Sequence, residues 1–160
     1  MVVDNFHDLV AWQLADQLRR EVLAFTRSGS VSKDFKYRDQ IRDAIASACR
    51  NTSEGFDRFR PAEFARFLEI ARGSLGEVKD CLIDGRDRGY INDEQFERLF
   101  TLARRAQGTN TNLGKYLRQC IAKGHESWRT KERTGNARPQ RARKTRTRTQ
   151  EPKTPRTQEP

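Results

Sequence analysis

Apolar residues recur at intervals of three and four along residues 5–124, which is the spacing of one face of an α-helix. The stripes are separated by short polar or glycine-containing segments, and no strand-like alternation of apolar and polar residues interrupts them. The pattern therefore predicts helices over 5–27, 34–55, 61–89 and 92–124. The clearest stripe belongs to the third helix and comprises Phe64, Phe67, Leu68, Ala71, Leu75, Val78 and Leu82.

Residues at the predicted ends support these boundaries. Gly55 is a typical stop signal for the second helix, and Pro61 is tolerated in the first turn of the third. Asn92 and Gln95 have the spacing of a capping box, in which each side chain accepts a hydrogen bond from the other residue's backbone N–H. The run 108–112, Gly-Thr-Asn-Thr-Asn, is poor in helix formers, so a kink or a frayed turn is expected there.

Amphipathic helices joined by short turns predict an all-α fold, an antiparallel up-down-up-down four-helix bundle over residues 1–124. Residues 125–160 have a different composition, rich in Arg, Thr, Pro and Gln and nearly free of apolar residues, and are expected to be a disordered tail. Residues 1–124 carry 21 Lys and Arg against 18 Asp and Glu, whereas the tail carries 11 against 4. Most of the net charge of +10 therefore belongs to the tail.

The tail is the strongest candidate for nucleic-acid binding. Its cations concentrate at Arg138, Arg141, Arg143, Lys144, Arg146 and Arg148. A basic arm of this kind releases counterions from phosphates and binds without reading sequence, in a salt-sensitive way. The alternative is an arm that serves only solubility.

Two groups of cations in the predicted bundle are further candidates. Arg104, Lys115 and Arg118 lie within about 60° of one another on the fourth helix. Arg58 and Arg60 precede the third helix, with Phe56 and Phe59 between and beside them. Both groups could contact phosphate, and both could equally be a solvated charged surface.

Catalysis and metal binding are not expected. The two histidines, His7 and His125, lie at opposite ends of the predicted bundle, and neither zinc-ligand spacing nor a phosphate-binding glycine loop occurs. No cofactor is expected.

The three cysteines, Cys49, Cys81 and Cys120, are expected to be buried thiols in a reducing cytoplasm. Neither a signal peptide nor a membrane-spanning stretch is predicted.

Several motifs in order resemble a known family. They are Phe6 to Gln13 (FHDLVAWQ), QIRDAIASACRNTSEG at 40–55, EFARFLEIARGSLGEV at 63–78, and Gly89-Tyr90-Ile91. Together they resemble the four helix bundle proteins, also called 23S ribosomal RNA intervening-sequence proteins, over about residues 5–122. The resemblance implies a bacterial homopentamer, often encoded within an insertion in the large-subunit rRNA gene. It also implies kinship with accessory proteins of diversity-generating retroelements, which partner a reverse transcriptase and nucleic acid.

This chain departs from the family pattern at two places. Residues 51–55 read Asn-Thr-Ser-Glu-Gly where the family has Asn-Ile-Ala-Glu-Gly, and the run 108–112 is unexpected. Asn51 and Glu54, which lie in the first of these, could hydrogen-bond to neighbouring helices and the nearby turn, or form a polar pocket or subunit contact. Leu9 and Trp12 fall opposite the main stripe of their helix, so they could pack over the end of their own bundle or contact another subunit.

Two functions fit these observations. The first is a cytoplasmic, oligomeric and non-enzymatic scaffold that binds RNA or DNA by charge, with a reverse transcriptase as a conceivable partner. The alternative is an oligomeric hub whose ligand is another protein. Attachment of the tail to an anionic membrane surface is weaker, because the tail lacks apolar anchors beside its cations.

Overall fold

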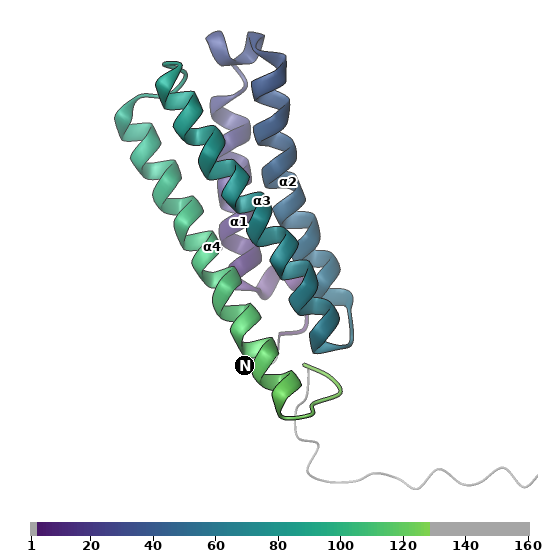
Figure 1. Ribbon diagram of the computed structural model, residues 1–160. Coiled ribbons are helices and arrows are strands. Elements are labelled where there is room, and N and C mark those ends of the chain that lie inside the picture. Colours follow the sequence, from purple (N-terminus) through teal and green to yellow (C-terminus); the bar gives the residue numbers. More distant parts are fainter. Residues whose placement is uncertain (1–2, 129–160) are drawn as a thin grey trace, which may run out of the picture.

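The computed structural model describes residues 3–128, and within them the chain is helical and contains no strand (Figure 1). Four helices carry the fold: α1 (Val10–Phe25), α2 (Phe35–Asp57), α3 (Pro61–Asp87) and α4 (Asp93–Ala122). Two short 3-10 turns, η1 (Phe6–Asp8) and η2 (Ser30–Lys33), precede α1 and α2. The predicted four-helix fold is confirmed.

The helices form a ring in which each contacts its neighbours in the chain, and α1 also contacts α4. Short turns join consecutive helices, so they run antiparallel (Figure 1). The α1–α2 and α3–α4 turns therefore lie at one end of the bundle, and the α2–α3 turn lies at the other end together with both ends of the described chain. We call these the upper and lower ends.

The predicted start of α4 is confirmed atom by atom. The backbone N–H of Gln95 donates to Asn92 Oδ1 at 2.8 Å, and the N–H of Asn92 donates to Gln95 Oε1 at 3.2 Å. Ile91 and Phe96, on either side of this cap, are both buried, as a hydrophobic staple requires. These contacts fix where α4 starts and thus which of its side chains face outward.

The first predicted helix is divided in the structure. Asn5 caps the short turn η1 by accepting a hydrogen bond from the His7 N–H at 3.2 Å, and Leu9 is extended before α1 starts. The Leu9 side chain is buried. In a continuous helix this side chain would point away from the apolar stripe of α1, whereas the extended backbone at Leu9 lets it point into the core. Packing of one side chain therefore overrides helical continuity at this position.

Gly55 does not stop the second helix, which continues to Asp57. Its physical role is a close approach between α2 and α3. A Cβ atom on Gly55 would lie 2.5 Å from Phe64 Cδ2 and 2.8 Å from Phe67 Cβ, both far below van der Waals contact. The glycine is therefore required by packing and not by a left-handed turn.

The expected kink at residues 108–112 does not occur, because α4 runs without interruption through this segment. Two threonine hydroxyls bond back to the helix, Thr109 to the Arg105 carbonyl at 3.1 Å and Thr111 to the Gln107 carbonyl at 2.8 Å. Tertiary packing against α3 overrides the low helix propensity of the run. The run affects the core instead, because it places the polar residue Asn110 at a buried position.

The hydrophobic core is divided into two clusters. The upper cluster contains residues such as Leu18, Ile45, Leu75 and Leu99, and the lower cluster consists of Leu9, Phe56, Phe64, Ala65, Leu68, Leu117 and Trp128. Ala15, Thr52, Ala71 and Asn110 are buried but belong to neither cluster. A layer of small and polar residues, one from each helix, therefore separates the two halves of the core.

Packed structure continues past the expected domain boundary at Gly124. Residues 125–128 lie against the lower end of the bundle, and both Ser127 and Trp128 are buried. Trp128, a large aromatic residue that follows Gly124 in a segment otherwise nearly free of apolar residues, is the sequence signal for this contact. The predicted disordered tail from residue 129 onward lies outside the described residues.

Candidate nucleic-acid interface

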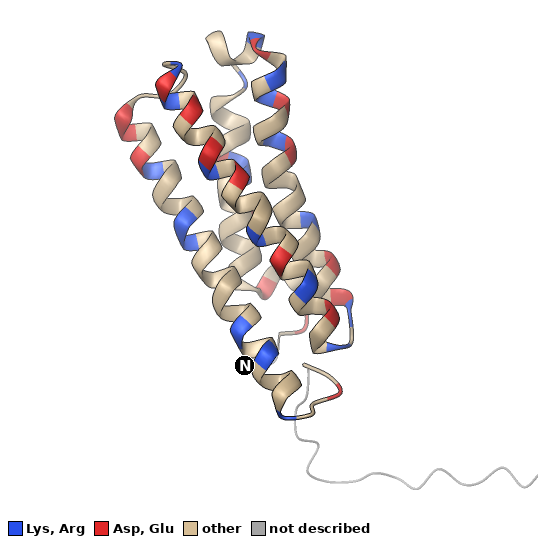
Figure 2. Cartoon of the chain, in the orientation of Figure 1, with Lys and Arg blue, Asp and Glu red and all other residues tan. Residues whose placement is uncertain are grey.

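The outer face of α4 carries the densest positive charge on the described chain. After Glu97 the helix and its C-cap contain Arg98, Arg104, Arg105, Lys115, Arg118 and the capping residue Lys123, and no Asp or Glu occurs between Glu97 and Glu126. We call these six residues the α4 cationic stretch. Figure 2 shows basic residues along the lower two thirds of α4, whereas acidic residues gather near the α3–α4 turn.

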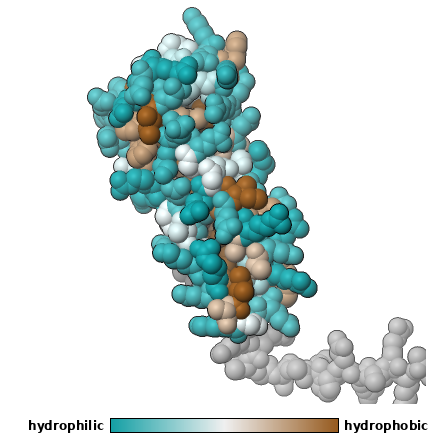
Figure 3. All heavy atoms as spheres, viewed as in Figure 1, coloured by the Kyte–Doolittle hydropathy of each residue, from teal (hydrophilic) through white to brown (hydrophobic). Residues whose placement is uncertain are grey.

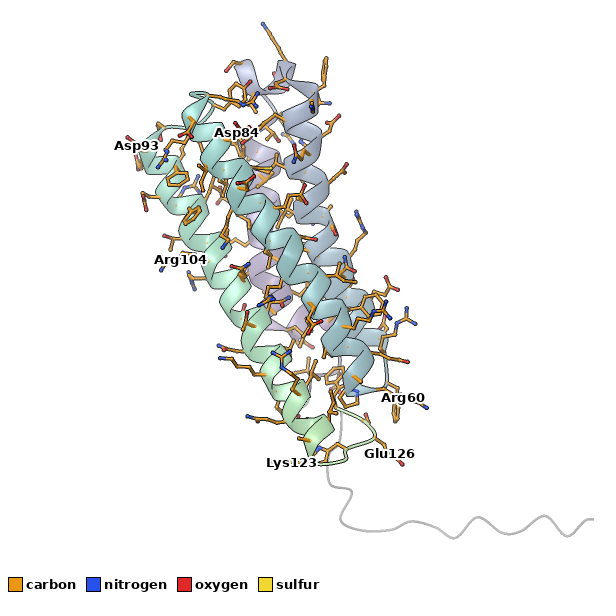
Figure 4. All side chains as sticks on the ribbon, viewed as in Figure 1. Arg60, Asp84, Asp93, Arg104, Lys123 and Glu126 are labelled. Carbon is orange, nitrogen blue, oxygen red and sulfur yellow. The ribbon has the colours of Figure 1, made fainter. Side chains whose placement is uncertain are left out.

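Most of this charge is uncompensated. Within residues 3–128, Arg104, Arg105, Lys115 and Lys123 form no ion pair. Arg98 pairs closely with Glu21 at 2.6 Å, and Arg118 approaches Glu69 at 3.5 Å. Arg104 points outward from α4 (Figure 4). The predicted group of Arg104, Lys115 and Arg118 is therefore exposed on one helix, and Arg105 and Lys123 extend it.

The cations before α3 are arranged differently. Arg58 pairs with Glu54 at 2.6 Å, and its guanidinium lies 4.9 Å from the centre of the Phe67 ring. Arg60 is exposed at the lower end (Figure 4). Of the two aromatics near them, Phe56 is buried in the lower cluster, whereas Phe59 is 64% exposed. Of these four residues, Phe59 and Arg60 are exposed and form no ion pair or ring contact within residues 3–128.

Trp128 fixes the place where the basic tail leaves the bundle. Its indole N–H donates to the Arg58 carbonyl at 2.9 Å. Its ring centre lies 5.0 Å from those of Phe56 and Phe64. The chain therefore departs beside the α2–α3 turn, close to the end of α4. The tail cations Arg138, Arg141, Arg143, Lys144, Arg146 and Arg148 lie outside the described residues.

Leu9 and Trp12 both pack within their own chain. Leu9 belongs to the lower cluster, and Trp12 is half-buried against it. The Trp12 ring meets Phe6 edge-on at 5.1 Å and His7 at 4.8 Å. Of the two alternatives, packing over the end of the bundle is therefore favoured for Leu9, because its buried side chain is not accessible to a second subunit.

Asn51 and Glu54 do not act as a pair. The Asn51 amide donates to the Ser47 carbonyl at 2.8 Å and to Ser47 Oγ at 3.1 Å, and that hydroxyl contacts Ser74 Oγ on α3 at 2.9 Å. Glu54 instead points to solvent and pairs with Arg58. Asn51 thus contributes to a polar contact between α2 and α3, and Glu54 to the charge balance of the turn.

A pocket between α3 and α4 is a site that the sequence pattern did not identify. It has a volume of about 120 Å³, and its wall includes Leu68, Glu69, Arg72, Asn110, Gly114 and Arg118. A shallower groove of about 580 Å³ adjoins it and shares Glu69, Arg72 and Thr111. Asn110 belongs to the run 108–112, so part of the run that predicted a kink instead lines a cavity beside an uninterrupted helix.

The cysteines are buried and free, as predicted. Burial raises the pKa of Cys49 to about 11, and burial likewise raises the pKa of Cys81 to about 11. These two thiols are therefore protonated at neutral pH and poor nucleophiles. In the part of the chain that the structure describes, no group of three or more metal-ligating side chains occurs, and none of the helices there could span a membrane.

The fold and this surface define a small helical-bundle protein with a cationic helix face. A family model for the 23S rRNA-intervening sequence protein matches residues 7–111, and the chain belongs to that family. It is also similar in structure to a protein of unknown function from the S23 ribosomal protein family of Bacteroides thetaiotaomicron. The two are 22% identical with a TM-score of 0.53, over 70% of this chain and 98% of that one. A comparison with curated proteins gives no match.

Proposed function

We propose that this protein is a non-enzymatic scaffold that binds RNA or DNA chiefly through phosphate contacts. The observation that carries the proposal is the α4 cationic stretch, which is exposed, largely unpaired and free of intervening acids. Cations fixed on one helix face neutralise phosphates and release counterions, so binding weakens steeply with salt. The name of the family, which refers to an intervening sequence of 23S rRNA, supports RNA as the ligand.

The tail extends this surface in the proposal. Trp128 holds the start of the tail at the lower end of the bundle, where Lys123 caps the end of α4 (Figure 4). The charged segment that starts about ten residues later can therefore reach the same strand that α4 contacts, since an extended residue spans roughly 3.3 Å. The folded face would position the nucleic acid, and the arm would add affinity.

Assembly into a homo-oligomer, for which the resemblance implies a pentamer, is part of the proposal and would repeat the cationic face around a ring. Large hydrophobic side chains that could join subunits are exposed, among them Val10, Phe35 and Phe59. On the face shown in Figure 3, the hydrophobic surface is divided into separate small groups. A reverse transcriptase partner and a role as a protein hub remain alternatives that light scattering and co-purification would address.

Neutralising α4 is expected to reduce the salt dependence of binding. In the full chain, the combined change Arg105→Gln, Lys115→Gln and Lys123→Gln should lower the slope of log K against log salt by about 2–3, because each lost phosphate contact removes about 0.7–0.9. Fluorescence anisotropy with a structured RNA and a duplex DNA measures this slope.

A matched control removes three other exposed cations, Arg27, Lys33 and Lys36, from the upper end of the bundle. The control has the same net charge as the α4 variant. Equal slopes in the two variants would show that net charge, and not the α4 face, determines binding, and would contradict the proposal.

A further inference from the structure

The pocket between α3 and α4 lies at the layer that separates the two hydrophobic clusters. On α4 the buried stripe passes from Ala106 in the upper cluster, through Asn110, to Leu117 in the lower cluster. Gly114, one turn after Asn110, has no side chain to fill the space, and a Cβ there would approach only the Arg118 guanidinium, at 3.8 Å. A polar residue and a glycine thus leave a cavity where an ordinary core would have two apolar side chains.

Asn110 is the unusual residue in this cavity. It is 2% exposed and lines the pocket, and its side-chain amide forms no hydrogen bond to any residue in the range 3–128. No side-chain nitrogen or oxygen in this range is both enclosed and unpartnered, so the amide reaches the open space of the pocket. An amide offers two donors and one acceptor. A polar ligand that enters the pocket would therefore find these groups available for hydrogen bonds.

The charges around the pocket narrow the kind of ligand. Arg72 and Arg118 line it from α3 and α4, and Glu69 lies 3.5 Å from the Arg118 guanidinium. A phosphate group alone would be repelled by the Glu69 carboxylate. The side chains are better satisfied by a ligand that has hydrogen-bond donors and acceptors on the part inside the pocket and an anionic group outside the pocket.

The size of the pocket and its surroundings agree with such a ligand. A cavity of roughly 150 Å³ accommodates a whole benzene ring, so this smaller pocket of about 120 Å³, which is open on one side, has room for the edge of a ring and not for all of it. The adjoining groove has glycines, Gly73, Gly76 and Gly108, in its wall and Arg104 at its edge. A chain of phosphates and sugars could therefore follow the groove while the edge of one ring enters the pocket.

We propose that the pocket receives the polar edge of one unstacked nucleobase of a single strand, and that this edge hydrogen-bonds to the Asn110 amide. Arg72 and Arg118 contact the flanking phosphate or stack on the base, and Arg104 contacts the next phosphate along the groove. This inference rests on the proposed nucleic-acid binding and adds one base-reading contact to it. Phosphate contacts alone carry no sequence information, so any base preference of this protein should come from this pocket.

The test compares the full chain with its Asn110→Leu variant, in which the side chain keeps its branched shape but loses its polar atoms. Single-stranded homopolymers of each base, as RNA and as DNA, are titrated at fixed salt and followed by anisotropy. The wild-type chain should prefer one base by about fivefold or more, the lower end of what a good base contact contributes. Asn110→Leu should reduce the preference to within twofold and leave the salt slope unchanged. The RNA and DNA arms distinguish the two sources of the base.

Glu69→Gln provides a second variant on the exposed rim, where folding is not at risk, and it should alter the base preference without abolishing binding. The Tm of Asn110→Leu should equal or exceed that of the wild type, because leucine is the better helix former and adds apolar contact at a buried position. Salt-dependent binding without any base preference, or a base preference that survives both substitutions, would overturn the proposed base contact in the pocket and leave the proposed function intact. Absence of binding to every strand would overturn the proposed function itself.

Discussion

Replacing Trp128 with alanine is expected to lower the free energy of unfolding by about 3–5 kcal/mol, the usual cost of removing a buried aromatic side chain. The ring is 7% exposed and packs against Phe56 and Phe64, and its N–H reaches the Arg58 carbonyl. The variant should lose the contact that joins the end of α4 to the α2–α3 turn. Urea denaturation followed by circular dichroism measures the change.

Trp128→Phe is the matched control, because it keeps an aromatic ring and removes the indole donor. It should cost less than the alanine change, with about 1 kcal/mol of the loss assigned to the hydrogen bond. If both variants unfolded at the wild-type urea concentration, Trp128 would not pack on the bundle, and the folded unit would end at Gly124 as the composition predicted.

Replacing Gly55 with alanine is expected to destabilise the bundle by about 1–3 kcal/mol, although alanine is the better helix former by about 1 kcal/mol. The added Cβ would lie 2.5 Å from the Phe64 ring, and Phe64 is completely buried in the lower cluster. Neither the ring nor the α2 backbone can move without opening the core. Thermal unfolding gives the sign of the effect.

Gly73→Ala serves as the control for helix propensity. A Cβ on Gly73 would have no atom within 4 Å, so this exposed helical glycine should accept alanine and gain about 1 kcal/mol. The two substitutions are chemically identical and should shift the Tm in opposite directions. A rise in Tm for both would mean that α2 and α3 are farther apart at Gly55 than the structure shows.

The fold could be predicted from the sequence because helical spacing and end signals agree with one another. The stripe from Phe64 to Leu82 and the Asn92–Gln95 cap require only local chemistry, and both appear as predicted. The predictions that differ from the structure involve contacts between distant residues. Leu9 points inward because it packs in the lower cluster. Position 55 requires glycine because the Phe64 ring on α3 leaves no room for a Cβ atom. Spacing along one helix contains no information on either contact.

The candidate interface could be predicted only in part, for the same reason. Charge can be counted along α4, so Arg104, Lys115 and Arg118 were identifiable. The pairing of Arg98 with Glu21, and the absence of an ion-pair partner for Lys115 within residues 3–128, depend instead on three-dimensional neighbours. In the sequence, Asn110 is distinguished only by its place in the run 108–112, whose residues are weak helix formers. The depth of its burial and the cavity beside it arise from packing of α3 against α4.

The measurement that tests the central claim most directly is binding of the full chain, and of a chain ending at Trp128, to structured RNA and duplex DNA across a salt series. The full chain should bind with a steep negative slope, and the shorter chain should bind more weakly with a shallower slope that is still not zero, because the α4 cationic stretch remains. If neither chain bound at low salt, the cationic face would not be a nucleic-acid interface, and the claim would be contradicted.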